Sequence, residues 1–383
     1  MHFRLPEETE LMRSAIRTFA EEVVGPGAVR RDQEGRIEPK LLRQMAELGL
    51  WGVPIPEAYG GAGGDALAFA VVLEELSRCC ASTAMAVAAH TSQLAWPLYR
   101  MGSDAQKREL LPALAGGRRL GAGYFGEGMT YRKTDKAYSI SGSGPIKANA
   151  GAADRLLVTA CEETVSGKRR SMASSAFIVQ CADSAASETG SLSLQKESAA
   201  LGLRAAAPGA LAMDGAKAAK ADRLGKKGQG EEAARHAAVL ESIGEAAIAA
   251  GIAQGAMEAA ISYAKQRKQF GTPIEKQQAI AFKLADMAVR TDASRWLAYQ
   301  AAWRLQEGLP CAKEASAAGN YAVRAAVAVC LDAVQIFGGN GYMQEYGVER
   351  MLRDAKSLEA AREVRAAGNI RDMICGHGGD KDA

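Results

Sequence analysis

Histidine and paired cysteines are scarce in this sequence. Four histidines occur among 383 residues, at positions 2, 90, 236 and 377. So few histidines do not favour a histidine-based metal site or a hydrolase triad. The seven cysteines are scattered, form no C-x-x-C pair, and include one adjacent pair, Cys79-Cys80. Because neighbouring cysteines seldom bridge, we interpret them all as reduced thiols of a cytoplasmic protein.

A large excess of one charge and a long apolar run are also missing. The net charge of +3 gives no electrostatic reason to expect nucleic acid or an acidic membrane as a partner. We expect no membrane span, and residues 1–4 (MHFR) lack the apolar core of a signal peptide. The composition, 48% hydrophobic and 24% charged over this length, is that of a folded protein of two or three domains.

The spacing of apolar residues divides the chain into helical, β and helical domains, expected at residues 1–120, 121–229 and 230–383. The first helix is expected to stop at Gly25-Pro26-Gly27, and Ser103 with Gln106 has the pattern of a helix N-cap. Short runs with strand character lie at residues 138–140, 155–160 and 176–179. Long helices over residues 231–268, 276–307 and 311–337 predict an antiparallel bundle.

Three segments resemble the acyl-CoA dehydrogenase family, particularly its short-chain or butyryl-CoA branch. They are residues 52–64 (GVPIPEAYGGAGG) with 73–77 (LEELS), residues 263–274 (YAKQRKQFGTPI), and residues 335–342 (QIFGGNGY) continuing through 345–350 and 353–355. They follow the family order across nearly the whole chain. The resemblance implies a mainly α fold with a helical N-terminal domain, a middle β-barrel or sandwich and a C-terminal four-helix bundle.

The same resemblance implies a function. Members of this family are homotetramers that hold FAD at subunit interfaces. In them a carboxylate removes the α-proton of an acyl-CoA thioester, and the β-hydrogen leaves as hydride to the flavin. We therefore expect an FAD-dependent oxidoreductase of fatty acid metabolism that acts on the CH–CH bond of a short acyl-CoA, in either direction. An electron-transferring flavoprotein is the partner that the resemblance implies.

The motifs also imply which residues hold the cofactor. Arg267 would meet the FAD pyrophosphate, because the guanidinium fork matches phosphate oxygens. Phe270 would pack near the adenosine half, and Gln278 would form a hydrogen bond with the cofactor. Gln335, Gly338 and Gly339 would approach the FAD of a neighbouring subunit, where glycine allows close backbone contact.

The chain departs from the family at the usual catalytic base. After Arg353-Asp354-Ala355 the family normally continues to a Tyr-Glu-Gly-Thr segment whose Glu is the base. Ungapped alignment places Arg362 at that position, and arginine stays protonated. Glu363 would serve only if the register slips by one residue.

A second base position exists in the isovaleryl and long-chain branches, on the long helix about seven turns before the R-x-x-F-G motif. Counting back from Arg267 leads to Glu241, which we predict to be the base. Glu245 lies one turn further along on the same face and is the alternative. The family's CoA-contacting Asp and Arg of this helix fall on Val239 and Ser242.

The β domain departs from the family as well. Its Thr-Glu-Pro turn is matched by Gly126-Glu127-Gly128, and its Trp-Ile-Thr by Ile146-Lys147-Ala148. Gly126, Ile146 and Ala148 offer none of the hydroxyl or aromatic groups that contact the flavin ring in the family. Lys147 either places a cation near the site or faces solvent.

These departures leave two alternatives open beside the dehydrogenase. One is a non-redox lyase or elimination enzyme acting on an acyl-CoA, with Arg362 binding an anionic acyl group. The other is a degenerate paralogue that serves as a scaffold. We rank the oxidoreductase first, because the cofactor motifs that are kept outnumber those that are lost.

Overall fold

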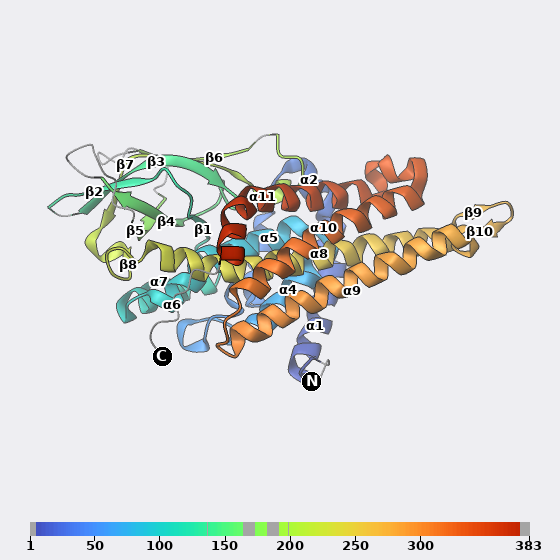
Figure 1. The fold of residues 1–383 in the computed structure, drawn as a ribbon, viewed down its shortest axis with the longest axis horizontal. Coiled ribbons are helices and arrows are strands. Elements are labelled where there is room, and N and C mark those ends of the chain that lie inside the picture. Colours follow the sequence, from blue (N-terminus) through green and yellow to red (C-terminus); the bar gives the residue numbers. More distant parts are fainter. Residues whose placement is uncertain (1–4, 136, 164–172, 182–190, 198, 376–383) are drawn as a thin grey trace.

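The N-terminal part of the chain is a set of helices packed around one buried helix. The computed structural model (Figure 1) describes residues 5–135, 137–163, 173–181, 191–197 and 199–375, with side chains up to residue 362. Helix α4 (Ala66–Cys79) is buried from Ala66 to Arg78. The others are α1 (Glu7–Phe19), α2 (Ala28–Glu34), α3 (Pro39–Glu47), α5 (Ala81–His90), α6 (Trp96–Met101) and α7 (Asp104–Ala115).

Two local predictions for this part can be compared with the structure. The capping box at Ser103 and Gln106 is confirmed, with reciprocal side-chain to backbone hydrogen bonds. The predicted stop at Gly25-Pro26-Gly27 is wrong. A π turn (Ala20–Val24) and a 3-10 turn (Gly25–Gly27) carry the helical path from α1 into α2. Pro26, the second residue of the 3-10 turn, is compatible with it because proline is tolerated within the first turn of a helix. The helical path ends at Gly35, which has a φ of 63°.

The middle part of the chain is a curved sheet with its own apolar core. Its strand order is β6-β7-β3-β2-β4-β5-β8, and β1 pairs in parallel with β4. The bounds are β1 (Gly121–Tyr124), β2 (Thr130–Lys133), β3 (Ala137–Ile146), β4 (Arg155–Glu162), β5 (Ser174–Gln180), β6 (Ser191–Lys196), β7 (Gly209–Ala219) and β8 (Arg223–Leu224). The three runs with expected strand character lie within β3, β4 and β5.

The C-terminal part is a bundle of four long helices, as the fold prediction expected. They are α8 (Gly230–Gln266), α9 (Gln278–Gln306), α10 (Ala312–Phe337) and α11 (Val348–Cys375). Helix α8 runs from the sheet to the β9–β10 hairpin (Lys268–Gln269 and Thr272–Pro273) at the far end of the molecule (Figure 1). Glycines let α8 approach α4 closely, since a β-carbon on Gly251 would lie 2.0 Å from the Ser77 hydroxyl oxygen.

Two bundle helices are long and apolar enough to cross a membrane, which the sequence prediction did not expect. They are Gly230–Gln266 and the helical stretch Ala312–Tyr342. In their most apolar windows, 78% of the first and 50% of the second lie buried inside the protein. Core helices of a bundle meet the same criterion, because they are apolar on most sides.

Two buried polar contacts join these parts. Asp354 on α11 accepts a hydrogen bond from the Leu203 backbone N–H at 2.7 Å, and burial raises the pKa of its carboxyl group to about 6. His90 on α5 accepts one from the Gly121 N–H at 2.9 Å through Nδ1. Burial lowers the pKa of His90 to about 4. Both contacts tie the middle part of the chain to the helices.

Candidate active site

Glu241 is buried in the first half of α8 and faces a lysine that directly follows β3. The Lys147 ammonium lies 2.7 Å from Glu241 Oε1 and 3.2 Å from Glu245 Oε1. The side chains of Lys147, Glu241 and Glu245 are 24%, 11% and 2% exposed. Lys147 therefore faces inward and bridges the two carboxylates that sequence analysis named as candidate bases.

The backbone that carries Lys147 is held firmly. Ile146 and Ala148 on either side of it are 1% and 0% exposed, so both are core residues. One residue further on, the Asn149 amide donates hydrogen bonds to the Ala86 carbonyl at 3.0 Å and the Gly121 carbonyl at 3.1 Å. These contacts fix the end of β3 against α5 and β1. The lysine thus extends from a rigid support, as a precise site requires.

Gln93 is a further member of the site, and sequence analysis did not name it. Its amide oxygen accepts a hydrogen bond from the Gly123 N–H at 3.1 Å, so its amide nitrogen must face the other way. That nitrogen donates to Glu241 Oε1 at 2.9 Å. Gln93 lies in a π turn, Thr91–Ala95, between α5 and α6. Such turns are frequent at functional sites, but the sequence carries no clear signal for one.

Arg362, at the family's usual base position, is part of the same buried cluster. Its Nη1 lies 2.7 Å from Glu245 Oε2, and its Nε donates to Asn320 Oδ1 at 2.7 Å. Its Nη2 donates to the Ser316 carbonyl at 2.8 Å. The Arg362 side chain is 7% exposed. The guanidinium is therefore held by α8 and α10, and it sits in space left by Gly319, where a β-carbon would lie 2.3 Å from the guanidinium carbon.

The cluster as a whole alternates in charge. It runs from Gln93 through Glu241, Lys147, Glu245 and Arg362, so each buried carboxylate has a cation beside it. Such pairing is what makes buried charges tolerable. Glu363, the third candidate base, lies outside the residues whose side chains are described.

Part of the predicted cofactor motif comes together at the far end of the bundle. Arg267, Gly338 and Gly339 line one cavity of about 250 Å³ together with Tyr263 and Asn340. Nothing lies within 4 Å of a β-carbon built on Gly338 or Gly339, and Gly338 has a φ of 58°. Phe270, at the tip of the β9–β10 hairpin, is 97% exposed. It does not line this cavity, and neither do the exposed residues Gln278 and Gln335.

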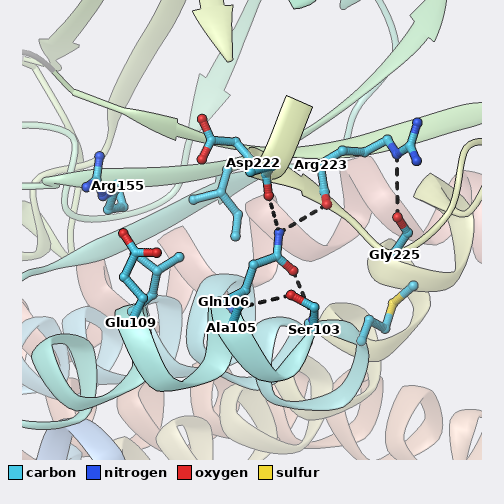
Figure 2. Close-up of a pocket in the computed structure, with 13 residues that line it drawn as sticks. Ser103, Ala105, Gln106, Glu109, Arg155, Asp222, Arg223 and Gly225 are labelled. Carbon is cyan, nitrogen blue, oxygen red and sulfur yellow. Dashed lines mark hydrogen bonds between the residues drawn. The ribbon is translucent and has the colours of Figure 1, made fainter. Parts of the chain in front are cut away.

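A separate cavity of about 420 Å³ lies between α7 and the sheet (Figure 2). Gln106 spans it and donates hydrogen bonds to the carbonyls of Ala221 at 2.7 Å and Arg223 at 3.1 Å. Its lining includes none of the Glu241 cluster and none of the predicted cofactor residues. We therefore place the candidate site at the Glu241 cluster and not in this cavity.

Comparisons with known proteins agree on one family. The N-terminal domain model of acyl-CoA dehydrogenases matches residues 6–118, and the C-terminal domain model matches residues 228–362. An acyl-CoA dehydrogenase of Bacillus subtilis is 39% identical over 91% of this chain and 93% of its own length.

Solved structures give the same picture. The butyryl-CoA dehydrogenase of Megasphaera elsdenii is 33% identical, with a TM-score of 0.87 over 97% of this chain and 100% of its own. A structure described as the electron transferring flavoprotein of Acidaminococcus fermentans is 33% identical, with a TM-score of 0.90 over 98% of this chain and 100% of its own.

Proposed function

The chain belongs to the acyl-CoA dehydrogenase family, and on this premise we propose that Glu241 is the base that removes the α-proton from a short acyl-CoA. The protein is an FAD-dependent oxidoreductase acting on the CH–CH bond of an acyl-CoA thioester. The short chain length is supported by similarity to the butyryl-CoA dehydrogenase. The single observation that carries the choice of base is the greater exposure of the Glu241 side chain, at 11% against 2% for Glu245.

Glu245 is committed on both oxygens. Its Oε1 faces Lys147 and its Oε2 faces Arg362, and its side chain is 2% exposed. The Glu241 side chain is more exposed, at 11%, and it contacts Gln93 and Lys147 through Oε1. A proton on Glu245 would break its ion pairs with both Lys147 and Arg362. The more exposed Glu241 is easier for a substrate to reach.

The proton transfer itself needs only these groups. The α C–H bond of the acyl group breaks, the proton moves to the Glu241 carboxylate, and the electron pair stays on carbon. FAD, when bound, supplies the acceptor for the β-hydrogen, which leaves as hydride. Gln93 keeps the carboxylate oriented through its hydrogen bond, and the burial of the cluster excludes competing water.

The residues at the far end of the bundle fit the adenosine and pyrophosphate part of FAD. Arg267 offers a guanidinium, and the two glycines beside it leave room for a phosphate to approach the backbone. Because Arg267, Gly338 and Gly339 line one cavity of one chain, they would contact the same FAD. Phe270 would cover the adenosine from the exposed hairpin tip. Gln278 and Gln335 would reach the cofactor from the adjoining helices.

A homotetramer and an electron-transferring flavoprotein complete this proposal. Four large apolar residues, Phe282, Val289, Trp296 and Trp303, are 43% to 67% exposed and recur every seven residues along α9. A stripe of this kind forms one face that a second copy of the chain would bury. The flavoprotein partner is supported by similarity to the Acidaminococcus fermentans structure. The cytoplasmic location expected from the cysteines stays a prediction.

The structure does not favour the alternative of an elimination enzyme. It required Arg362 to bind an anionic acyl group, but this guanidinium pairs with Glu245 and contacts α10 through two further hydrogen bonds. We therefore carry only the oxidoreductase forward.

Two measurements test the proposal. Purified protein should show a flavin absorption spectrum that is bleached by butyryl-CoA without oxygen. Glu241→Gln should keep the flavin but lose bleaching and turnover by at least about a hundredfold, which is what loss of a general base costs. Glu231→Gln, at an exposed position near the start of the same helix, is the matched control and should behave as wild type. Near-normal turnover in Glu241→Gln would show that the base is elsewhere.

A further inference from the structure

We propose that Lys147 is a positioning residue for the reaction, and that it acts by holding the Glu241 carboxylate in its charged form and by moving to Glu245 when Glu241 takes a proton. This inference rests on the proposed role of Glu241 as base. It assigns a function to a position where the family motif has no charge.

The first observation is the geometry of the bridge. The Lys147 ammonium is 2.7 Å from Glu241 and 3.2 Å from Glu245, so the same cation contacts both acids without moving its backbone. An ammonium carries three donors and can satisfy two carboxylates at once. The backbone on both sides of Lys147 is buried, so the lysine has few alternative positions.

The second observation is how the charges balance. With Glu241 ionised, the two carboxylates offset Lys147 and Arg362, and the cluster has no net charge. Once Glu241 has accepted the α-proton, the cluster carries one positive charge, while the substrate carries the electron pair left on carbon. In a buried site of low dielectric, that positive charge stabilises the developing negative charge. Without Lys147, the cluster would carry one negative charge before the proton transfer and no net charge after it.

The third observation is that Glu245 is available as a second partner for Lys147 throughout. Arg362 holds Glu245 Oε2, which leaves Glu245 Oε1 facing the lysine. When Glu241 is neutralised, Lys147 keeps an anion within reach and is not left as an unpaired buried cation. Among the residues whose side chains are described, Gln93 from the π turn, Lys147 after β3, and Glu245 with Arg362 behind it lie around Glu241.

The test is the pH dependence of the holoenzyme. Lys147→Gln keeps a donor near Glu241 but removes the charge, and Lys147→Arg keeps the charge. The acidic limb of the kcat/KM profile should move to higher pH by about one unit or more in Lys147→Gln, since an adjacent cation favours the ionised carboxylate. In Lys147→Arg the limb should stay close to that of wild type. A loss that is merely structural would lower the profile without moving its limb.

A second readout does not depend on turnover of the flavin. Exchange of the butyryl-CoA α-protons with D2O, measured by mass spectrometry without an electron acceptor, reports proton transfer alone. Below the acidic limb it should fall about tenfold for each unit by which the limb moves in Lys147→Gln. Glu245→Gln offers an independent variant with the opposite sign. It removes a neighbouring negative charge and leaves Lys147 beside Glu241, so the limb should move to lower pH.

The outcomes separate the two proposals. If Glu241→Gln is inactive and the limb of Lys147→Gln coincides with that of wild type, the role of Lys147 is overturned and Glu241 remains the base. If Glu241→Gln exchanges α-protons at the normal rate, the proposed function itself is wrong. If Lys147→Gln does not fold, a limb that stays in place or rises in Glu245→Gln overturns the inference.

Discussion

Arg362 occupies the space that a side chain at Gly319 would need. A β-carbon on Gly319 would lie 2.3 Å from the Arg362 guanidinium carbon, and the guanidinium is anchored by Asn320, Ser316 and Glu245. Because the guanidinium is held from several sides, Arg362 cannot move away from a new side chain without a loss of stability. The glycine and the arginine are therefore structurally dependent on each other.

This dependence predicts that the effect of Gly319→Ala on stability changes sign when Arg362 is replaced. Gly319→Ala should lower the melting temperature of the protein, with a loss of about 1–3 kcal/mol from overpacking. In a protein that already carries Arg362→Ala, the same change should instead stabilise by about 0.5–1 kcal/mol, because alanine is the better helix former. Thermal melts of the four proteins check this. An effect of equal sign in both backgrounds would contradict it.

The buried pair of Arg362 and Glu245 predicts a second result. Arg362→Met alone leaves Glu245 short of one cation and should cost about 3–5 kcal/mol in the free energy of unfolding. Adding Glu245→Met should restore part of this loss, since apolar replacement of a whole buried pair is far less costly than removal of one partner. Denaturant unfolding of both variants measures the recovery. A double variant as unstable as the sum of its single changes would mean that the two residues do not interact.

A third prediction concerns pH and the carboxyl group of Asp354. Its pKa of about 6 in the fold lies above the ordinary value of 3.8, so the folded state binds the proton more tightly than the unfolded state. The contribution of this group to stability is therefore present at low pH and is lost as pH rises from about 4 to about 6. Measured against Asp354→Asn, wild type should lose about 2 kcal/mol of relative stability between pH 4 and pH 7.

The pH dependence of stability that His90 contributes has the opposite sign. Its pKa of about 4 lies below the ordinary 6.5, so its contribution is present above pH 6.5 and is lost as pH falls toward 4. Measured against His90→Gln, wild type should lose relative stability on acidification. Parallel curves for wild type and either variant would contradict the linkage for that residue.

Arg267 should control FAD affinity. Arg267→Gln should weaken FAD binding to the apoprotein about ten- to a hundredfold, because a charge-assisted contact to the pyrophosphate is lost. The dissociation constant can be followed by flavin fluorescence. Lys265→Gln removes the same charge two residues away at another exposed position and is the matched control. Equal weakening in both variants would indicate a general charge effect and would argue against the proposed contact.

The apolar stripe on α9 should control assembly. Trp296→Glu places a charge within the face formed by Phe282, Val289, Trp296 and Trp303, and it should convert the proposed tetramer into smaller species. Light scattering after gel filtration measures this. Leu11→Glu, at another exposed apolar position on α1, should leave the assembly intact. A tetramer that survives Trp296→Glu would place its interface on another surface.

Apolar spacing predicted much of the fold from the sequence. The long helices α8, α9 and α10 each begin and end within two residues of the expected bounds, because each is a long stretch of good helix formers bounded by residues that end helices. The continuation through Gly25–Gly27 was missed, since glycine and proline there are compatible with a 3-10 turn. Local signals do not distinguish a turn that redirects a helix from one that ends it.

The site was only partly predictable. Glu241 was found by counting along one helix, and Glu245 follows from helical geometry. Gln93 and the inward direction of Lys147 were not predictable, because both depend on how the π turn and the end of β3 meet α8. Arg362 was noticed as a departure, but its ion pair with Glu245 requires the packing of α11 against α8.

The anchored guanidinium of Arg362 also constrains how this sequence can evolve. An arginine at position 362 needs a glycine at 319 for room and an acid at 245 for charge. A substitution at any one of the three gives an intermediate that is either crowded or holds an unpaired buried charge. We therefore expect these three positions, which are far apart in the sequence, to change together among related chains.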